Sequence, residues 1–359
     1  MTAPEISVLL PAFDAELTLA AALASVQRQT ETRWECLVVD DGSRDGTREI
    51  ALAVARSDAR VRVLSRPHGG IVSALQAGLA ECRAPLVARM DADDLMSRRR
   101  LELQRTALEQ APELTAVGCH VRLFPRRHLR ARRIDYERWL GSIRTPDDVQ
   151  REAFVECPIA HPTLVIRKRA LDEFGYRDAA WPEDYDLLLR LLHAGHRIGV
   201  VPRRLLHWRD GPSRLSRTSD RYAISAFVQC KAEFLARGFL ARGERYLLWG
   251  FGDTGRRLRK RSLSVANSRQ PSSSCTPGAS VSSFAACAWS RRVHCPRCLA
   301  CRSSSPWPGS RLARKFAWPS RAWAIASSRT TCARPEGRCG AQTAEIAWNF
   351  RLWAVSVPA

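Results

Sequence analysis

The chain has 359 residues, of which 45% are hydrophobic, and this is enough to build a core and up to two domains. No apolar run approaches 18 residues and the N-terminus lacks a charged-then-apolar pattern, so we expect neither a transmembrane helix nor a signal peptide, and a cytoplasmic protein. The formal charge of +21 indicates an anionic partner, such as nucleic acid, a membrane surface or an anionic substrate.

The composition changes sharply near residue 261. Residues 262–359 contain 13 basic and 2 acidic residues, with seven of the twelve Cys and six of the eleven Trp. They show no helical or alternating periodicity longer than a few residues. Arg, Ala, Ser, Pro, Cys and Trp are what a GC-rich coding sequence yields when it is read out of frame. We therefore expect a frameshift near Lys260–Ser262 and a non-native, disordered tail.

The N-terminal part begins with two strand-then-helix units. Ile6 to Leu10 is an apolar run typical of a buried strand, and the apolar spacing over residues 15–29 predicts a helix. Trp34 to Val39 predicts a second strand. An Asp- and Gly-rich turn from Asp40 to Thr47 ends this strand and precedes a helix over residues 48–55.

Two further units follow, with strands predicted over Val61 to Leu64 and Leu86 to Met90 and a helix between them that begins at Gly69 and runs through Leu79. Short strands that are apolar on both faces and alternate with helices predict an α/β, Rossmann-like, mainly parallel sheet with flanking helices. In such sheets ligands bind at the carboxyl ends of the strands.

Three carboxylates follow the fourth strand within four residues: Asp91, Asp93 and Asp94. Like charges this close repel one another, so such a cluster is usually offset by a basic side chain or a metal ion. Oxygen ligands suit Mg²⁺ or Mn²⁺. The alternative is a solvated acidic turn that caps a helix beginning near Ser97. A second acidic strand end, at Asp40 and Asp41, favours the binding site.

Four segments, in this order, resemble the nucleotide-binding half of the family 2 glycosyltransferases of the GT-A fold, over roughly residues 5–215. The segments are Ile6 to Asp14 (ISVLLPAFD), Val38 to Thr47 (VVDDGSRDGT), Gly69 to Gly78 (GGIVSALQAG) and Arg89 to Asp94 (RMDADD).

The resemblance implies roles for five of these residues. Pro11 and Phe13 would line the nucleotide base, and Asp41 would accept a hydrogen bond from it. Asp93 would hold a divalent metal, Mn²⁺ or Mg²⁺, on the diphosphate, with Asp91 near the donor sugar or the metal waters. The alternative for Asp40 and Asp41 is an Asx-turn that ends the strand, and Phe13 could equally be a core residue.

A third acidic cluster lies in Trp181 to Arg190 (WPEDYDLLLR). Acids at a helix start also serve as caps and dipole partners. The resemblance implies instead that Asp184 is the general base that deprotonates the acceptor hydroxyl. It also suggests that Arg209 and Arg214 reach the diphosphate, because a guanidinium matches phosphate oxygens, although surface arginines are common. His161 is either a contact to phosphate or acceptor, or structural.

The basic run Arg126 to Arg133 is either a solvated loop or a site of attraction to an anionic acceptor or membrane surface. No nucleic-acid recognition motif accompanies it, so we expect no nucleic-acid partner. A helix is predicted over residues 221–237. Gly250 to Gly255 (GFGDTG) then matches a phosphate-binding turn, which we interpret as the start of a second α/β unit truncated by the change of frame.

The predicted domains are a GT-A glycosyltransferase domain over 1–220, a helix plus the start of a truncated Rossmann-like unit over 221–261, and an out-of-frame tail over 262–359. The predicted function is transfer of a sugar from a nucleotide-diphosphate sugar to a hydroxyl of a glycan, lipid-linked or small-molecule acceptor, with inversion. The alternative is a catalytically inactive module that binds nucleotide sugars or an anionic surface.

Overall fold

The structure is a computed structural model that describes residues 3–211, 214–238, 247–249, 255–258, 260–262 and 351–353. Most of the predicted out-of-frame tail, and residues 250–254 of the glycine-rich turn, lie outside the described residues. The predicted division into three domains therefore stays a prediction. Among the helices of the described ranges, none has both the length and the hydropathy of a membrane span.

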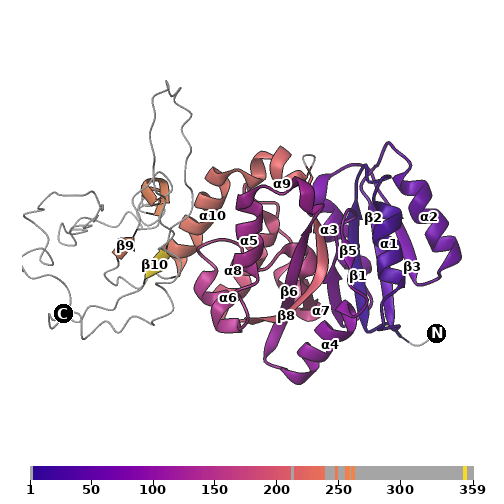
Figure 1. Cartoon of the computed structure of the whole chain (residues 1–359), viewed down its shortest axis with the longest axis horizontal. Helices are drawn as coiled ribbons and strands as arrows, with labels where there is room; N and C mark the ends of the chain where they lie inside the picture. Colours follow the sequence, from indigo (N-terminus) through magenta and orange to yellow (C-terminus); the bar gives the residue numbers. More distant parts are fainter. Residues whose placement is uncertain are drawn as a thin grey trace, which may run out of the picture.

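An eight-stranded sheet forms the centre of the described fold, and helices lie along both of its faces (Figure 1). Its strand order is β3-β2-β1-β4-β7-β6-β8-β5. The strands span β1 Ile6–Ala12, β2 Trp34–Asp40, β3 Val61–Ser65, β4 Leu86–Arg89, β5 Leu95–Met96, β6 Leu114–Phe124, β7 Val165–Arg167 and β8 Arg197–Arg209. Two short strands, β9 Leu247–Trp249 and β10 Arg351–Trp353, form a separate antiparallel pair.

The first four strands of the chain are parallel, as predicted: β1 pairs with both β2 and β4, and β2 pairs with β3. Beyond β4 the sheet is mixed. β7 runs antiparallel to β4 and β6, β5 runs antiparallel to β8, and β6 is parallel to β8. The predicted α/β class with flanking helices is confirmed. The regular strand–helix alternation ends at β4, which is why the later antiparallel strands carried no comparable signal in the sequence.

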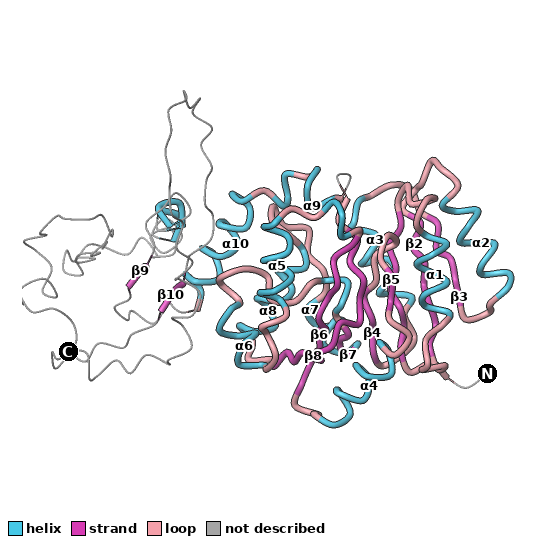
Figure 2. The backbone as a smooth tube through the Cα atoms, viewed as in Figure 1, coloured by secondary structure: helices cyan, strands magenta, loops and turns pink. Residues whose placement is uncertain are grey.

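The helices cover the two faces of the sheet in two groups (Figure 2). One face packs against α1 Leu19–Gln27, α2 Thr47–Ser57, α4 Arg100–Gln110 and α5 Ala131–Leu140. The other packs against α3 Gly70–Glu81, α6 Pro146–Glu152, α7 Lys168–Phe174, α8 Glu183–His193 and α10 Ile224–Arg237. The shorter elements are α9 Leu215–Thr218 and the 3-10 helices η1 Arg126–His128, η2 His161–Thr163 and η3 Asp220–Tyr222.

Strand β1 shows why the sheet needs helices on both sides. All seven of its residues are buried, and alternate side chains enter different apolar clusters. Val8 and Leu10 belong to the cluster that includes α1, whereas Leu9 belongs to the cluster that includes α3. Each such side chain contributes about 1.5–3 kcal/mol relative to an exposed one, so neither face can be left open to water.

Gly78 allows α3 to approach the sheet closely. A Cβ atom at this position would lie 2.4 Å from Leu9 Cδ1 and 2.6 Å from Val39 Cγ2, and both of those side chains are fully buried. The close approach also fixes the first turn of α3, which lies beside the end of β2. A glycine within a helix costs about 1 kcal/mol relative to alanine, and here this cost permits tight packing.

We expect the substitution Gly78→Val to lower the free energy of unfolding by about 2 kcal/mol or more, because the added methyl groups overpack a rigid core. Urea denaturation of Gly78→Val and of Ala80→Val provides the measurement, since Ala80 lies on the exposed face of the same helix. A loss at Gly78 no larger than the loss at Ala80 would show that close packing does not require glycine at this position.

Candidate functional site

The loops that follow β1, β2 and β4 meet at one edge of the sheet. The Asp41 N–H donates to the Ala12 carbonyl oxygen (2.9 Å), and the Met90 N–H donates to the Leu9 carbonyl oxygen (3.1 Å). Because these strands are parallel neighbours, their carboxyl ends coincide. The predicted site residues that follow the three strands are therefore brought to the same edge.

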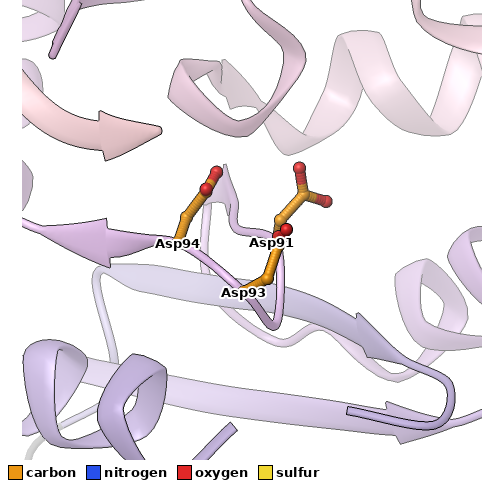
Figure 3. A group of neighbouring side chains, drawn as sticks. All are labelled: Asp91, Asp93 and Asp94. Atoms are coloured by element: carbon orange, nitrogen blue, oxygen red, sulfur yellow. The ribbon is translucent and has the colours of Figure 1, made fainter. Parts of the chain in front are cut away.

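An acidic turn after β4 carries Asp91, Asp93 and Asp94, whose carboxylates point to the same side of the turn (Figure 3). One oxygen from each carboxylate lies within 4.8 Å of the others. Burial and the charge of Asp91 raise the pKa of Asp93 to about 6. The turn therefore concentrates negative charge that a cation would stabilise.

Asp94 is the most enclosed of the three. Its side chain is fully buried, and burial together with its two acidic neighbours raises its pKa well above the ordinary value. One oxygen accepts a hydrogen bond from the Arg209 N–H (2.7 Å) and so joins the acidic turn to the end of β8. The other, Oδ2, has no hydrogen-bond partner among the described residues. Sequence reasoning assigns roles to Asp91 and Asp93 alone, although three acids in four residues is the available signal for Asp94.

Arg89 is a partner of the acidic turn that sequence reasoning missed. It is 4% exposed, and its Nη2 lies 2.6 Å from Asp91 Oδ1. The signal was a charged residue inside a strand that is otherwise apolar. A buried arginine of this kind offsets part of the charge that accumulates beyond β4.

Pro11 is the next-to-last residue of β1, and Phe13 follows directly after the strand ends at Ala12. Pro11 is a buried residue of the strand, whereas Phe13 is 41% exposed and stacks on His68, with 4.2 Å between ring centroids. The two stacked rings form a flat, partly exposed surface at the same edge of the sheet. Phe13 is therefore not a core residue.

Asp41 is 3% exposed, and its carboxylate caps the first turn of α3. It accepts hydrogen bonds from the N–H groups of Gly70 (2.7 Å) and Gly69 (3.1 Å to Oδ1), and His68 Nδ1 lies 2.9 Å from its Oδ2. The local turn considered for Asp40 and Asp41 is seen at Asp40, whose Oδ1 accepts a hydrogen bond from the Ser43 N–H (3.1 Å), whereas Asp41 contacts the next helix. Gly69 also donates to Oδ2 (3.2 Å), and Arg66 Nε lies 3.6 Å from Oδ1, so the carboxylate is held from several sides.

A second group of acids begins α8. Asp184 is partly buried and accepts a hydrogen bond from the Tyr185 N–H (2.7 Å). Burial and the neighbouring Glu183 raise the pKa of Asp184 to about 7. Asp186, by contrast, is fixed by Arg177 and Arg190 (2.7 Å each), so its ionised form is stabilised. Only the first two acids of this helix have the raised pKa values of acid–base groups.

Arg209 and Arg214 lie beside the acidic turn. Arg209 Nε donates to the Asp93 carbonyl oxygen (2.8 Å), and its guanidinium carbon lies 4.6 Å from the Phe124 ring centroid. The guanidinium carbon of Arg214 lies 4.5 Å from the Trp208 ring centroid. Both arginines lower the pKa of Asp93, which shows that their charges act on the cluster.

These residues fit a divalent cation. The acidic turn offers three hard oxygen ligands, and Asp94 Oδ2 is a buried acceptor with no partner among the residues described. Hard oxygen ligands favour Mg²⁺, Ca²⁺ or Mn²⁺ over softer metals. A bound cation would lower the raised pKa values of Asp93 and Asp94, because ligand carboxylates bind metal in their ionised form.

Comparison with known proteins agrees with this geometry. The model of the family described as Glycosyl transferase family 2 matches residues 7–175. EpsE of Bacillus subtilis (strain 168), which is named as a glycosyltransferase, is 30% identical over 227 residues, covering 62% of this chain and 78% of that protein. The amylovoran biosynthesis glycosyltransferase AmsE of Erwinia amylovora is 29% identical over 249 residues, covering 67% and 91%.

The fold has a matching solved structure as well. S. aureus TarS 1–349 in complex with UDP-GlcNAc superposes with a TM-score of 0.54 at 16% identity, covering 74% of each chain. At that identity the likeness concerns the fold alone, and it agrees with the GT-A architecture expected from the sequence. With the family match and the relatives above, it follows that this chain belongs to glycosyl transferase family 2.

Proposed function

We propose that this chain transfers a sugar from a nucleotide-diphosphate sugar to an acceptor hydroxyl, with inversion at the anomeric carbon. The observation that carries the proposal is the presence of two acidic groups of different character. One is the three-carboxylate turn after β4, and the other is Asp184 on α8, whose pKa is raised. The first is suited to a metal-bound diphosphate and the second to taking a proton.

The nucleotide would bind at the carboxyl ends of β1 and β2. The exposed face of Phe13 offers a surface on which a base can stack, with Pro11 behind it in the strand. Asp41 would accept a hydrogen bond from the base while it continues to cap α3. The TarS complex, which contains UDP-GlcNAc, supports a nucleotide sugar as the ligand class.

The diphosphate would lie over the acidic turn. Asp93 would hold Mn²⁺ or Mg²⁺ together with Asp94, and Asp91 would face the donor sugar or the metal waters. A divalent ion bound there supplies positive charge to the departing diphosphate. Arg209 and Arg214, already beside the turn, would add guanidinium contacts to the phosphate oxygens.

Asp184 would act as the general base in a single displacement. Its carboxylate takes the proton of the acceptor hydroxyl while that oxygen forms a bond to the anomeric carbon. The bond from the anomeric carbon to the diphosphate oxygen breaks, and its electron pair leaves with the nucleotide diphosphate. A pKa near 7 is well matched to this task, because about half of the groups are ionised at neutral pH and the ionised form is still basic.

The acceptor is a glycan, a lipid-linked sugar or a small molecule. The name of AmsE, an enzyme of amylovoran biosynthesis, supports a role in making cell-envelope polysaccharide.

We place the reaction in the cytoplasm. The five cysteines of the described residues are all free and buried, as expected of a protein in a reducing compartment.

The donor proposal predicts that one of UDP-glucose, UDP-N-acetylglucosamine, GDP-mannose or TDP-glucose raises the melting temperature of the chain, and does so only with Mn²⁺ present. At a hundred times its dissociation constant a ligand adds about 2.7 kcal/mol of stability. The Asp93→Asn variant should lose the shift, whereas Asp147→Asn, at a position 82% exposed, should keep it.

Two results of the same panel would count against the proposal. If no donor shifts a chain that melts cooperatively, the donor site is not formed. If a donor shifts the melting temperature but is not consumed with any acceptor, the chain is the inactive binding module considered above.

The base proposal predicts that Asp184→Asn lowers kcat by about a hundredfold or more while the donor still binds. The pH profile of the parent enzyme should rise with a midpoint near 7, because only the ionised carboxylate accepts a proton. Steady-state kinetics between pH 5.5 and 9 provide the measurement. An unchanged kcat, or a flat profile in that range, would exclude Asp184 as the base.

The same substitution should stabilise the fold at pH 8. The folded pKa of about 7 lies above the ordinary value of 3.8, so the folded chain binds this proton more tightly than the unfolded chain. Ionisation of Asp184 therefore removes stability as the pH rises from about 4 to 7. The amide of Asp184→Asn cannot ionise, and we expect the melting temperature of this variant to exceed that of the parent at pH 8 but not at pH 4. Thermal melts at the two pH values distinguish this effect from a simple loss of structure.

A further inference from the structure

The side chain of Arg89 lies on the face of the sheet that α8 covers. Along β4, Leu86 and Ala88 enter the apolar cluster of the opposite face, whereas Val87 enters the cluster that contains α8. Because strand residues alternate between faces, Arg89 follows Val87. A charged side chain has thus been placed on the face of the sheet that also carries the helix beginning with Glu183.

The main chain of Arg89 is fixed on both sides. Its N–H donates to the Leu164 carbonyl oxygen (2.8 Å), and its own carbonyl oxygen accepts from Arg100 Nη2 (2.8 Å). The guanidinium group pairs with Asp91 (2.6 Å) and donates to the Met90 carbonyl oxygen. Its Nε has no hydrogen-bond partner among the described residues. A buried N–H left in this state is uncommon.

A short polar chain joins the segment beside Arg89 to the first acid of α8: the main chain of Arg89 bonds Leu164, the residue after η2, and His161 begins η2. His161 Nε2 is 3.0 Å from the Tyr176 hydroxyl, and His161 Nδ1 is 3.9 Å from Glu183 Oε1. The Tyr222 hydroxyl closes the chain on the other side, 2.8 Å and 2.9 Å from the two Glu183 oxygens. All four side chains are buried or nearly so. The charge on Arg89 acts on His161 and on Glu183, and both His161 and Glu183 therefore lie within its electrostatic reach.

We propose that Arg89 is a positioning residue that fixes the donor-side acid Asp91 relative to the acceptor-side acids Glu183 and Asp184, an inference that rests on the proposed transferase function. Direct displacement requires the leaving group, the anomeric carbon and the base to be aligned. Asp91 and Asp184 belong to separate elements, the turn after β4 and the start of α8. Arg89 is a buried cation that pairs with Asp91 and whose charge also acts on Glu183 and Asp184, so it connects the two acidic groups electrostatically.

Double-mutant cycles test whether Arg89 connects Asp91 with the acids of α8. They are measured by thermal melts of the full chain, without donor or metal. Each of Asp91→Asn and Glu183→Gln is combined with Arg89→Met, which keeps the length of the side chain and removes its charge. In both cycles the change from acid to amide should be more favourable in Arg89→Met than in the parent by at least about 3 °C, because it removes a charge left without its cation.

Asp186→Asn is the matched control. Asp186 is a fully buried acid on the same helix, but it is paired with Arg177 and Arg190. Its effect should therefore be additive with Arg89→Met, to within about 1 °C. If Glu183→Gln is equally additive, Arg89 does not connect the two acidic groups and the proposal is wrong. If Arg89→Met does not fold, the cycles are run on Arg89→Gln, which also removes the charge, and additivity there has the same meaning.

Kinetics separate positioning from a purely structural role. With whichever of UDP-glucose, UDP-N-acetylglucosamine or GDP-mannose the parent consumes with Mn²⁺, Arg89→Met should lower kcat about a hundredfold and leave the donor KM within about threefold. Arg89→Lys should recover at least about tenfold of the loss. A folded Arg89→Met variant with kcat within threefold of the parent would overturn the proposal. If the parent consumes no donor, the proposed function fails, whereas the melting cycles still decide whether Arg89 connects the acids.

Discussion

Repulsion between carboxylates at the carboxyl end of β4 is the constraint on which the rest of this structure depends. Three of them share one turn, with an oxygen of each within 4.8 Å. Two arginines offset part of this charge. Arg89 pairs with the Asp91 carboxylate, and Arg209 bonds the Asp93 carbonyl oxygen. The compensation is incomplete, since the pKa of Asp93 remains raised to about 6. The turn therefore keeps an excess of negative charge, which the divalent cation proposed above would offset.

The core around the turn is arranged to keep it in place. Arg100 and Gln104 of α4 are fully buried polar residues with satisfied side-chain contacts: Arg100 donates to the Arg89 carbonyl oxygen, and Gln104 Nε2 donates to the carbonyl oxygens of Val117 (3.0 Å) and Thr163 (2.8 Å). These bonds connect β4, β6 and η2 through one helix. Fully satisfied buried polar networks specify one arrangement of a core more strictly than apolar packing does. Contacts outside the site therefore help to fix the position of the acidic turn.

Sequence reasoning reached the first half of the fold and the residue types of the site, and it failed where contacts cross between distant segments. The apolar runs of β1, β2 and β4 and the acids that follow them are local signals, so the parallel sheet and the edge that carries Asp41 and Asp93 could be predicted. The bond from Asp94 to the Arg209 N–H, for example, joins positions 115 residues apart. The antiparallel strands β5 and β7 are short and do not belong to a βαβ pattern, so the sequence gives little indication of them.

The central claim is that the turn after β4 binds the metal and diphosphate of a donor whose anomeric carbon faces Asp184. A crystal structure of the chain with Mn²⁺ and its nucleotide-sugar donor, with anomalous diffraction recorded near the manganese edge, tests that claim most directly. The account predicts one anomalous peak within ligand distance, about 2.0–2.3 Å, of an Asp93 oxygen, with the donor sugar between the metal and Asp184. A peak at another site, or a donor whose sugar points away from α8, would contradict it.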